Sequence, residues 1–510
     1  MIALTVAQIA EIVGGRLADI TPEQAARTTV TGTVEFDSRR ITPGSLFLAL
    51  PGARADGHDH AAPAVAAGAV AVLAARPVGV PAIVVAPVAS DSRSGALEHD
   101  DEAGSGAAVL AALAKLAGAV SAALVAKGLT IVGVTGSSGK TSTKDLIAAV
   151  LTPLGQVVAP PGSFNNELGH PWTVLRADEN TDYLVLELSA RHRGNIAALA
   201  AIAPPRVAVV LNVGTAHLGE FGSREAIADT KAELAQAVPA SGVVILNVDD
   251  SAVAAMADKT AARVVRVSRT ERAAEVLAGP SGVWAGPVLL DELARPRFTL
   301  HTGAGEAEIR LGVSGDHQVG NALCAAAVAL ECGATPQQVA DALAAAGPAS
   351  QHRMHVSTRA DGVTVIDDAY NANPDSMRAA LQALAWIARG QGPGGPGTPR
   401  RSWAVLGEMA ELGEDAISEH DRIGRLAVRL DVSRLIVVGV GRSMGAMHHG
   451  AVMEGSWGAE ATAVADVDAA LALLRAELGP GDVVLVKASN SAGLTALADA
   501  LTGDDRGVRG

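Results

Sequence analysis

The segment TGSSGKTST, residues 135–143, has the residue types and spacing that bind phosphate groups. It follows the apolar run IVGV (131–134) and precedes the helical run KDLIAAVL. In that context glycines let backbone N–H groups turn toward phosphate oxygens, and the helix N-terminus adds a positive dipole. We predict that Lys140 contacts the terminal phosphates and that Thr141 binds Mg²⁺. The predicted phosphate-binding residues are Thr135, Gly136, Ser137, Ser138, Gly139, Lys140, Thr141 and Ser142.

Two observations limit the function that can be inferred from this loop. Val134 stands where the longer P-loop pattern has glycine, so the match is to the shorter TGxxGKT form. The alternative is a Gly/Ser turn that caps a helix, which the preceding strand and following helix disfavour. The loop indicates a nucleotide, but it does not distinguish hydrolysis, phosphoryl transfer, ligation or signalling.

Three further side chains could act near the phosphates. Glu187 ends the apolar run YLVLEL (183–188), where a carboxylate can hold Mg²⁺; the alternative is an acid at a helix start. A lone histidine such as His217 is more often structural, and a helical lysine such as Lys231 is usually solvated. The chain has only seven lysines against 33 arginines, however. A desolvated lysine can react with carbon dioxide to give a metal-binding carbamate, so Lys231 is a candidate.

The elements that must position these residues alternate short β-branched runs with longer Ala/Leu runs, as in strands covered by helices on both faces. They form two series, one before and one after about residue 350. The carboxyl ends of parallel strands form the ligand crevice, and polar residues follow several of these runs. The predicted strands are 131–134, 183–188, 207–212, 243–247, 363–367, 403–406, 434–438 and 483–487. The polar residues at their ends are Glu187, Asn212, Asp367, Asp368, Glu408 and Lys487.

The composition favours a soluble enzyme of several domains. A length of 510 residues predicts about three domains, because a single core stops growing near ~250–300 residues. Hydrophobic residues make up 49% and charged residues 18%, which is enough apolar surface to fold. Aromatic residues are only 2% and the net charge is −14, so we expect no nucleic-acid partner.

Membrane and redox signals are weak. The first residues lack a basic segment before their apolar stretch, so no signal peptide is expected. Residues 107–126 are about long enough to span a membrane, but they are Ala-rich and contain Lys115, which favours a buried helix and no membrane span. Cys324 and Cys332 match neither a zinc pair nor a redox pair, and we expect a cytoplasmic protein.

Several separated motifs together resemble the Mur ligase family of ATP-dependent amide-forming enzymes. The resemblance covers essentially the whole chain, and the joint order of the motifs is more specific than any one of them. The motifs are FDSRRITPGSLFLALPGARADGHDH (36–60), GVTGSSGKTSTKD (133–145), SFNNELGHPWTVL (163–175), LELSARHRGNI (186–196), NVGTAHLGEFGS (212–223), GDHQVGNALCAAAVA (315–329), HRMHV (352–356), IDDAYNANPDSM (366–377) and VLGEMAELGEDAISEHDRIG (405–424).

The resemblance implies an α/β protein of three domains. These are an N-terminal UDP-substrate-binding domain (1–106), a central P-loop-type ATPase domain with a mostly parallel sheet (107–349) and a C-terminal Rossmann-like domain (350–510). Residues 90–106 are then a polar insertion or linker, and the Gly/Pro run 390–400 a second insertion, neither with an expected catalytic role.

The resemblance also assigns roles to single residues. Ser38 and Arg39 are similar to the site for the uridine diphosphate, and Asn165 and Asn166 to contacts with the muramoyl-peptide. Glu187 matches the magnesium-binding glutamate, His217 a second metal-site histidine and Lys231 a carbamylated lysine. Residues similar to those that approach the nucleotide between the central and C-terminal domains are Asn321, Arg353, Asp367, Tyr370, Asn371 and Asn373.

The implied reaction joins the peptide carboxylate of UDP-MurNAc-tripeptide to the amine of D-alanyl-D-alanine. ATP and two Mg²⁺ ions are the implied cofactors, an acyl phosphate is the intermediate, and a monomer is expected. Two alternatives remain open. The preceding Mur ligase adds the third amino acid, but its DNPR motif is absent and NANP stands at 371–374. A catalytically silent nucleotide-binding protein of this fold is the other.

Two departures from the family pattern motivate the silent alternative. Asn490 stands where the family usually has Arg, and Arg191 stands where Asn is common. The more distant folylpolyglutamate synthetases share the phosphate loop but not the N-terminal motif at 36–60.

Overall fold

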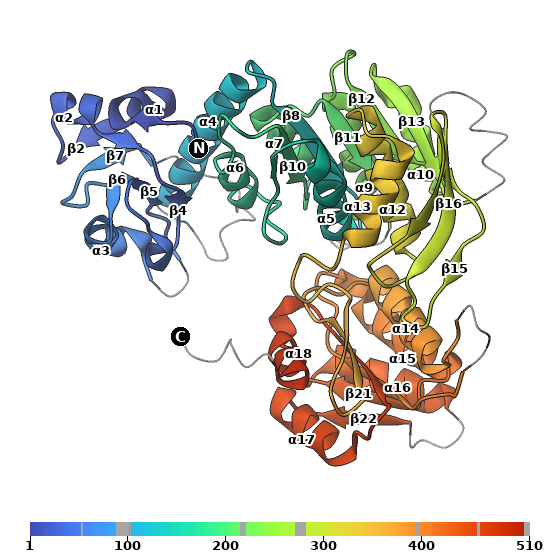
Figure 1. Cartoon of the computed structure of the whole chain (residues 1–510). Helices are drawn as coiled ribbons and strands as arrows, with labels where there is room; N and C mark the ends of the chain where they lie inside the picture. Colours follow the sequence, from blue (N-terminus) through green and yellow to red (C-terminus); the bar gives the residue numbers. More distant parts are fainter. Residues whose placement is uncertain are drawn as a thin grey trace.

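Three α/β units follow one another along the chain in the computed structural model (Figure 1). The first unit lies beside the second, and the third lies below them in that view. The structure describes residues 1–52, 55–87, 101, 104–214, 221–270, 282–392, 395, 397–455 and 460–503. His217, most of the predicted insertion 90–106 and part of the run 390–400 lie outside the described residues. The domain limits given above stay a proposal, and the sheets below give the observed extents.

The first unit is a five-stranded sheet in the order β2-β7-β6-β5-β4, in which only β2 runs antiparallel to its neighbour. A separate pair, β1 and β3, is antiparallel. The strands are β1 (Leu4–Thr5), β2 (Arg16–Ala18), β3 (Thr29–Val30), β4 (Val34–Glu35), β5 (Ser45–Leu48), β6 (Ala69–Ala74) and β7 (Ala82–Val84). The helices are α1 (Val6–Val13), α2 (Pro22–Arg27) and α3 (Ala61–Ala66), with short 3₁₀ turns η1 (Ser38–Arg40) and η2 (Gly57–His60).

The second unit is a ten-stranded sheet in the order β15-β16-β14-β13-β12-β11-β8-β10-β9, with β17 paired to β16. Strands β8 to β14 run parallel to one another, and β16 pairs antiparallel with β14, β15 and β17. The strands are β8 (Thr130–Thr135), β9 (Val157–Val158), β10 (Tyr183–Glu187), β11 (Val207–Val210), β12 (Val243–Asn247), β13 (Arg263–Ser268), β14 (Gly282–Ala285), β15 (Leu289–Leu290), β16 (Pro296–Thr302) and β17 (Gly305–Arg310).

Helices cover both faces of this sheet because its strands alternate between two cores. Along β8, Ile131 belongs to the core shared with the first unit, whereas Val132 and Val134 belong to the core on the opposite face. Such strands, buried on both sides, explain the continuous apolar runs in the sequence. The helices are α4 (Ser105–Val125), α5 (Lys140–Leu151), α6 (Gly169–Val174), α7 (Asn195–Ile202), α9 (Arg224–Ala237), α10 (Ser251–Ala254), α12 (Gln318–Glu331) and α13 (Pro336–Ala345), with 3₁₀ turns η3 (Thr152–Leu154) and η4 (Ala255–Lys259).

Helix α4 is the Ala-rich segment for which a buried helix was predicted, and it is a helix. Among the described residues it is the one helix long and apolar enough to cross a membrane by length and composition. About half of its most apolar window, 56%, is buried inside the protein. It packs against α1, α6 and α7, so it joins the cores of the first and second units.

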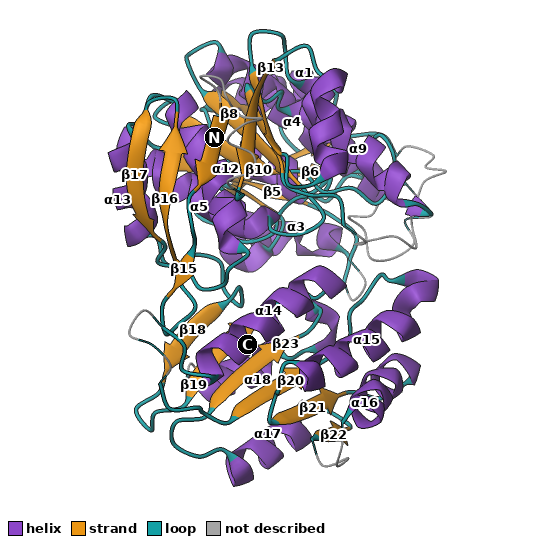
Figure 2. Cartoon of the chain, turned by 90° about the vertical axis from the view of Figure 1, so that its right-hand side faces the viewer, coloured by secondary structure: helices purple, strands orange, loops and turns teal. Residues whose placement is uncertain are grey.

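The third unit is a six-stranded sheet in the order β18-β19-β23-β20-β21-β22, in which only β18 is antiparallel (Figure 2). The strands are β18 (His355–Thr358), β19 (Thr364–Asp368), β20 (Ser402–Leu406), β21 (Arg434–Val438), β22 (Ala461–Val464) and β23 (Val483–Lys487). The helices are α14 (Pro374–Ala388), α15 (Ala416–Arg429), α16 (Arg442–Glu454), α17 (Val467–Glu477) and α18 (Thr495–Thr502), with 3₁₀ turns η5 (Gly413–Asp415) and η6 (Asn490–Ala492).

All eight predicted strands are present, and the strand register brings their polar ends together. Glu187 pairs with Val134 and Thr135 pairs with Val210, so three carboxyl ends share one edge of the second sheet. In the third sheet Asp368 pairs with Lys487 in the same way. The fold is therefore α/β with three units, as the sequence predicted. The antiparallel edge β15 to β17 was not predicted.

Candidate active site

The loop between β8 and α5 is held in one conformation by residues from neighbouring elements. Gly139 has a φ of 81°, a left-handed conformation that favours glycine. A Cβ at this position would lie 2.8 Å from Asn321 Oδ1, so α12 packs directly against the loop. Asn212 Oδ1 accepts from the backbone N–H of Ser138 at 3.0 Å, and its Nδ2 donates to the Ser138 carbonyl at 3.2 Å. Protein contacts thus pre-organise the predicted phosphate loop.

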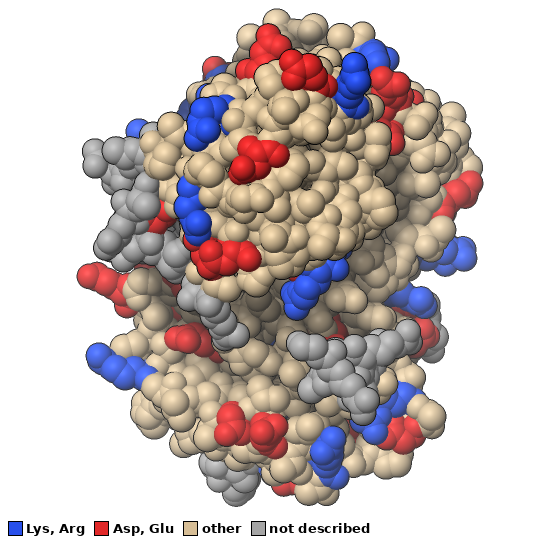
Figure 3. All heavy atoms as spheres, turned by 90° about the vertical axis from the view of Figure 1, so that its left-hand side faces the viewer, with Lys and Arg blue, Asp and Glu red and all other residues tan. Residues whose placement is uncertain are grey.

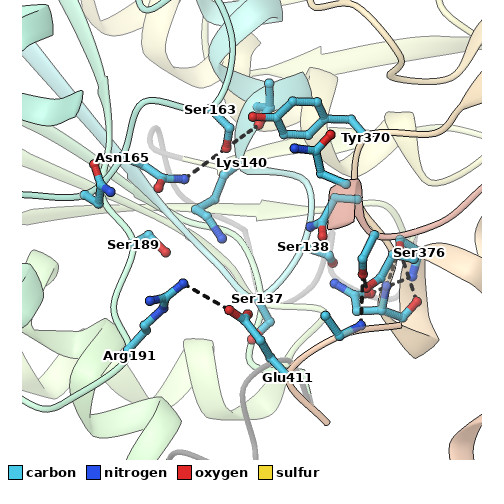
Figure 4. Close-up of a pocket in the computed structure, with 18 of the residues that line it drawn as sticks. Ser137, Ser138, Lys140, Ser163, Asn165, Ser189, Arg191, Tyr370, Ser376 and Glu411 are labelled. Atoms are coloured by element: carbon cyan, nitrogen blue, oxygen red, sulfur yellow. Dashed lines mark hydrogen bonds and ion pairs between the residues drawn. The ribbon is translucent and has the colours of Figure 1, made fainter. Parts of the chain in front are cut away.

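Lys140 is the first residue of α5 and extends toward the middle of a cavity (Figure 4). Its Nζ donates to the Gly136 carbonyl at 2.6 Å. No side chain caps the start of α5, so its first N–H groups remain available to an anion. Burial lowers the pKa of Lys140, and the charge of Arg353 acts the same way, whereas that of Glu187 opposes it. A phosphate in this cavity would stabilise the charged form of Lys140.

Glu187 lies at the end of β10 and is completely buried. Its Oε2 accepts from Asn165 Nδ2 and Thr141 Oγ1, both at 3.3 Å, and lies 3.4 Å from Ser163 Oγ. Its Oε1 has no hydrogen-bond partner among the described residues. Burial raises the pKa of the Glu187 carboxyl, against the nearby charges of Lys144, Lys140 and Arg353.

The oxygen set around Glu187 fits a magnesium ion. Mg²⁺ takes hard oxygen ligands, and here the hydroxyl of Thr141 contacts a carboxylate whose other oxygen has no partner among the described residues. A bound cation would remove the cost of burying this carboxylate. Within the described part of the chain, no three His, Cys, Asp or Glu side chains come together as a metal site, so the fit rests on the hydroxyl and this one carboxylate.

Lys231 is buried within α9, with 8% of its surface exposed. Burial lowers its pKa well below the usual value, and the charge of Lys140 lowers it further. The alternative that Lys231 is a solvated helical lysine is therefore wrong. His217, the predicted metal-site partner, lies outside the described residues.

A cavity of about 580 Å³ lies between the second and third units. Figure 3 shows a hollow between the upper and lower parts of the molecule on one face. The predicted residues that line this cavity are Ser137, Ser138, Gly139, Lys140, Thr141, Ser142, Asn165, Asn166, Arg353, Tyr370, Asn371 and Asn373. The predicted residues outside its described lining are Ser38, Arg39, Thr135, Gly136, Glu187, Lys231, Asn321 and Asp367. The structure thus brings together most of the predicted nucleotide residues.

A buried ion pair stabilises the side of the cavity that the third unit forms. Lys487 Nζ lies 2.5 Å from Asp368 Oδ2 and donates to the Asn371 carbonyl at 2.8 Å. This fixes the loop that carries Tyr370, whose ring lies 4.7 Å from the guanidinium carbon of Arg353. Asn373 begins α14 as its N-cap and accepts from the Ser376 backbone N–H at 2.9 Å.

Asp367 is turned away from the cavity, toward the linker between the units. Its Oδ2 lies 2.8 Å from His352 Nδ1. Burial raises the pKa of Asp367, and the neighbouring His352 opposes the shift. Asn321, also outside the cavity lining, donates to Gln318 Oε1 at 2.8 Å and supports the phosphate loop from behind.

The first unit contacts α6 of the second unit through an aromatic side chain. Trp172 on α6 donates to the Val34 carbonyl at 2.8 Å and packs edge-on against Phe36. Ser38 and Arg39 lie just beyond Phe36 in η1, where Arg39 is exposed and pairs with Asp37 at 2.9 Å. The predicted UDP-binding segment therefore adjoins the helix that follows Asn165 and Asn166.

Sequence reasoning gave no site role to Lys144, Ser163 and Ser489, and it marked Asn212 only as a polar residue at a strand end. Lys144 Nζ donates to the Pro160 carbonyl at 2.7 Å and so anchors the loop that leads to Ser163. Asn212 accepts from the Ser138 N–H and so holds the phosphate loop. Ser489 Oγ accepts from the Ala410 N–H at 2.9 Å. The strand-end position of Asn212 was a usable signal, whereas the contacts of Lys144, Ser163 and Ser489 are visible only in the fold.

Models of known families match most of the chain in three segments. The Mur ligase family catalytic domain matches residues 32–121, the Mur ligase middle domain residues 134–329, and the Mur ligase glutamate ligase domain residues 352–490. The chain therefore belongs to the Mur ligase family and is an ATP-dependent, amide-forming ligase.

Individual relatives narrow the class. The chain is 76% identical to the UDP-N-acetylmuramoyl-tripeptide–D-alanyl-D-alanine ligase of Mycobacterium tuberculosis, over 99% of each chain. Its structure is similar to that of MurF from Acinetobacter baumannii, with a TM-score of 0.78, 28% identity and 98% and 99% of the two chains covered. It is also similar to Thermotoga maritima MurF ligase in complex with ADP, with a TM-score of 0.71, 26% identity and coverage of 93% and 98%.

Proposed function

We propose that this ligase adds D-alanyl-D-alanine to UDP-N-acetylmuramoyl-tripeptide, a cell-wall precursor, with cleavage of ATP to ADP and phosphate. The observation that carries the proposal is that the phosphate loop, Asn165 and Asn166 line one cavity between two units, with the buried Glu187 hydrogen-bonded to Asn165. The identity of 76% with a ligase of that name over the full length supports the choice of substrates. We further propose that the enzyme is a cytoplasmic monomer.

Charge is the main obstacle to this reaction. A carboxylate is a poor electrophile, so the γ-phosphoryl group must first pass to it and form an acyl phosphate, which the amine then attacks. The carboxylate and the triphosphate are both anionic and must come within bonding distance. Lys140 and the free N–H groups at the start of α5 counter that repulsion and the charge that develops on the transferred group.

Thr141 and Glu187 are the residues that would hold Mg²⁺ at this site, because Thr141 Oγ1 lies 3.3 Å from Glu187 Oε2 and Glu187 Oε1 has no partner among the described residues. A bound magnesium ion would neutralise phosphate charge. Asn165 donates to Glu187 and lines the cavity, so it connects the Glu187 carboxylate to the place where the peptide acid must lie.

Lys231 is proposed to carry a carbamate that, with His217, holds a second magnesium ion. Burial and the nearby Lys140 favour the neutral amine of Lys231. A neutral amine attacks the carbon of CO₂, a C–N bond forms and the nitrogen releases one proton. The product is an anion, which suits a buried position beside a lysine better than a second ammonium does.

One assay tests the proposed function. Phosphate release from ATP is measured with purified UDP-MurNAc-tripeptide, with and without D-alanyl-D-alanine. Strict dependence on both supports the proposal. Turnover with a single amino acid but not with the dipeptide would indicate the ligase that adds the third residue, and no turnover on well-folded protein would indicate a silent nucleotide-binding protein.

A further inference from the structure

Arg191 and Glu411 form an ion pair across the mouth of the active-site cavity (Figure 4). Arg191 follows β10 in the second unit, and Glu411 follows β20 in the third. Arg191 Nη2 lies 3.1 Å from Glu411 Oε1, and both side chains are partly exposed, at 46% and 37%. The pair therefore joins two units that the proposed reaction needs close together.

Both partners are mounted on ordered loops. Asn195 Oδ1 accepts from the backbone N–H of Arg191 at 3.1 Å and from that of His192 at 2.9 Å. Glu411 has a φ of 63°, a left-handed conformation that is costly for a residue with a side chain. Its loop is held from the next strand, because Ser489 donates its N–H to the Glu408 carbonyl at 2.9 Å and Ser489 Oγ accepts from Ala410. The two loops therefore lose little conformational freedom when the pair forms, and the entropic cost comes mainly from the two side chains.

The two units also meet at the opposite end of the large sheet. Trp386 on α14 donates to the Asp291 carbonyl at 2.8 Å, beside β15. Ala294, from the same turn of the second unit, is buried in the core of the third unit. Strand β15 stands first in the sheet order and β10 next to last, so this buried contact and the ion pair lie at opposite ends of the sheet. A rotation of the third unit about the buried contact would separate Arg191 from Glu411.

We propose that the Arg191–Glu411 ion pair is a latch that holds the second and third units closed over the cavity, and that both are positioning residues for the ligase reaction. The inference goes beyond the proposed function, and only its kinetic readout rests on it. Arg191, which stands where Asn is common in the family, would then serve to form this interunit ion pair.

The expected size of the effect follows from the exposure of the pair. Partly exposed ion pairs change an equilibrium by about two- to fivefold, and salt screens them. Reversal of one charge replaces an attraction by a repulsion, so we expect each of Arg191→Glu and Glu411→Arg to lower kcat/KM by about fivefold or more. The ratio of closed to open molecules of the full-length protein should fall by a similar factor.

The experiment compares both single variants with the double charge swap. Small-angle X-ray scattering of the full chain with ADP and Mg²⁺ reports the closed fraction, and phosphate release reports kcat and the KM for D-alanyl-D-alanine. Arg191→Gln and Glu411→Gln repeat the test without repulsion, in case a reversed charge prevents folding. The matched control is Arg193→Glu, because Arg193 lies on the same loop and pairs with Asp229 inside the second unit.

We expect both single variants to be more open and slower, the double swap to recover both properties, and Arg193→Glu to resemble the wild type. High salt should reduce the difference between wild type and the neutral variants. The proposal is overturned if the double swap fails to recover either the scattering profile or the kinetics, or if Arg193→Glu matches the Arg191 variants. Loss of dipeptide dependence in the wild type would instead refute the proposed function and leave the scattering comparison intact.

Discussion

We predict that the protein loses stability in mild acid and that part of this loss comes from one side chain, His170. It lies in α6 and is fully buried. Burial lowers the pKa of His170 from its usual 6.5 to about 4, although backbone groups of Glu187 and Leu199 oppose the shift. Between these two values the unfolded chain binds a proton that the folded chain does not, so stability falls as the pH falls through this window.

The magnitude follows from the two pKa values. Integrated over the window, this one group costs about 2 kcal/mol between pH 7 and pH 5 and about 3 kcal/mol by pH 4. Below pH 4 the folded chain takes up the proton as well, and the loss attributable to His170 levels off. His170→Leu has similar bulk and cannot be protonated, so it should lack this part of the acid sensitivity.

The assay is hydrogen–deuterium exchange at the amides of α6, corrected for the intrinsic pH dependence of exchange, because it reports the local opening free energy. From pH 7 to pH 5 the opening free energy of the wild type should fall by about 2 kcal/mol more than that of His170→Leu. His355→Gln is the control, since His355 is exposed. Equal pH slopes for wild type and His170→Leu would refute the reasoning that His170 is buried and neutral.

Three other substitutions test the site. Lys140→Ala should abolish phosphate release, because the loop loses its charge on the terminal phosphates; appreciable turnover would contradict that role. The Lys231→Ala variant should release phosphate slowly and partly recover its rate when a short carboxylic acid is added to the buffer. ¹³C NMR under ¹³CO₂ should show a carbamate signal in the wild type only. An unaffected rate, or no carbamate signal in the wild type, would contradict the proposed carbamate. Lys487→Met leaves Asp368 buried without its partner, so thermal or urea unfolding of the third unit should show a loss of about 3–5 kcal/mol, and a neutral result would mean that Asp368 is solvated.

The parts of the site that lie on one short stretch of chain could be predicted from the sequence. The phosphate loop is such a stretch, because strand, glycine-containing turn and helix are all local. Glu187 and Asn212 could be found as polar residues at the ends of apolar runs, since parallel strands end at one edge of a sheet. The antiparallel edge β15 to β17 was missed because β16 and β17 alternate buried and exposed residues, whereas the predicted strands were continuous apolar runs.

Side-chain burial, and pairs between residues far apart in the sequence, could be identified only from the tertiary structure. A helical lysine is usually solvated, and only the packing of α9 shows that Lys231 is buried near Lys140. Lys487 and Asp368 are 119 residues apart, and the parallel register of β19 and β23 makes them partners. No sequence spacing identifies such a pair.

The sequence by itself determined the class of chemistry, the order of the three units and the strands that carry the polar residues, because these depend on local residue types and periodicity. Tertiary structure alone decided which side chains lose their water, which opposite charges meet and how two units close around one cavity. The physical reason is that desolvation and ion pairing depend on distances in space, which the chain sets only when distant segments pack together.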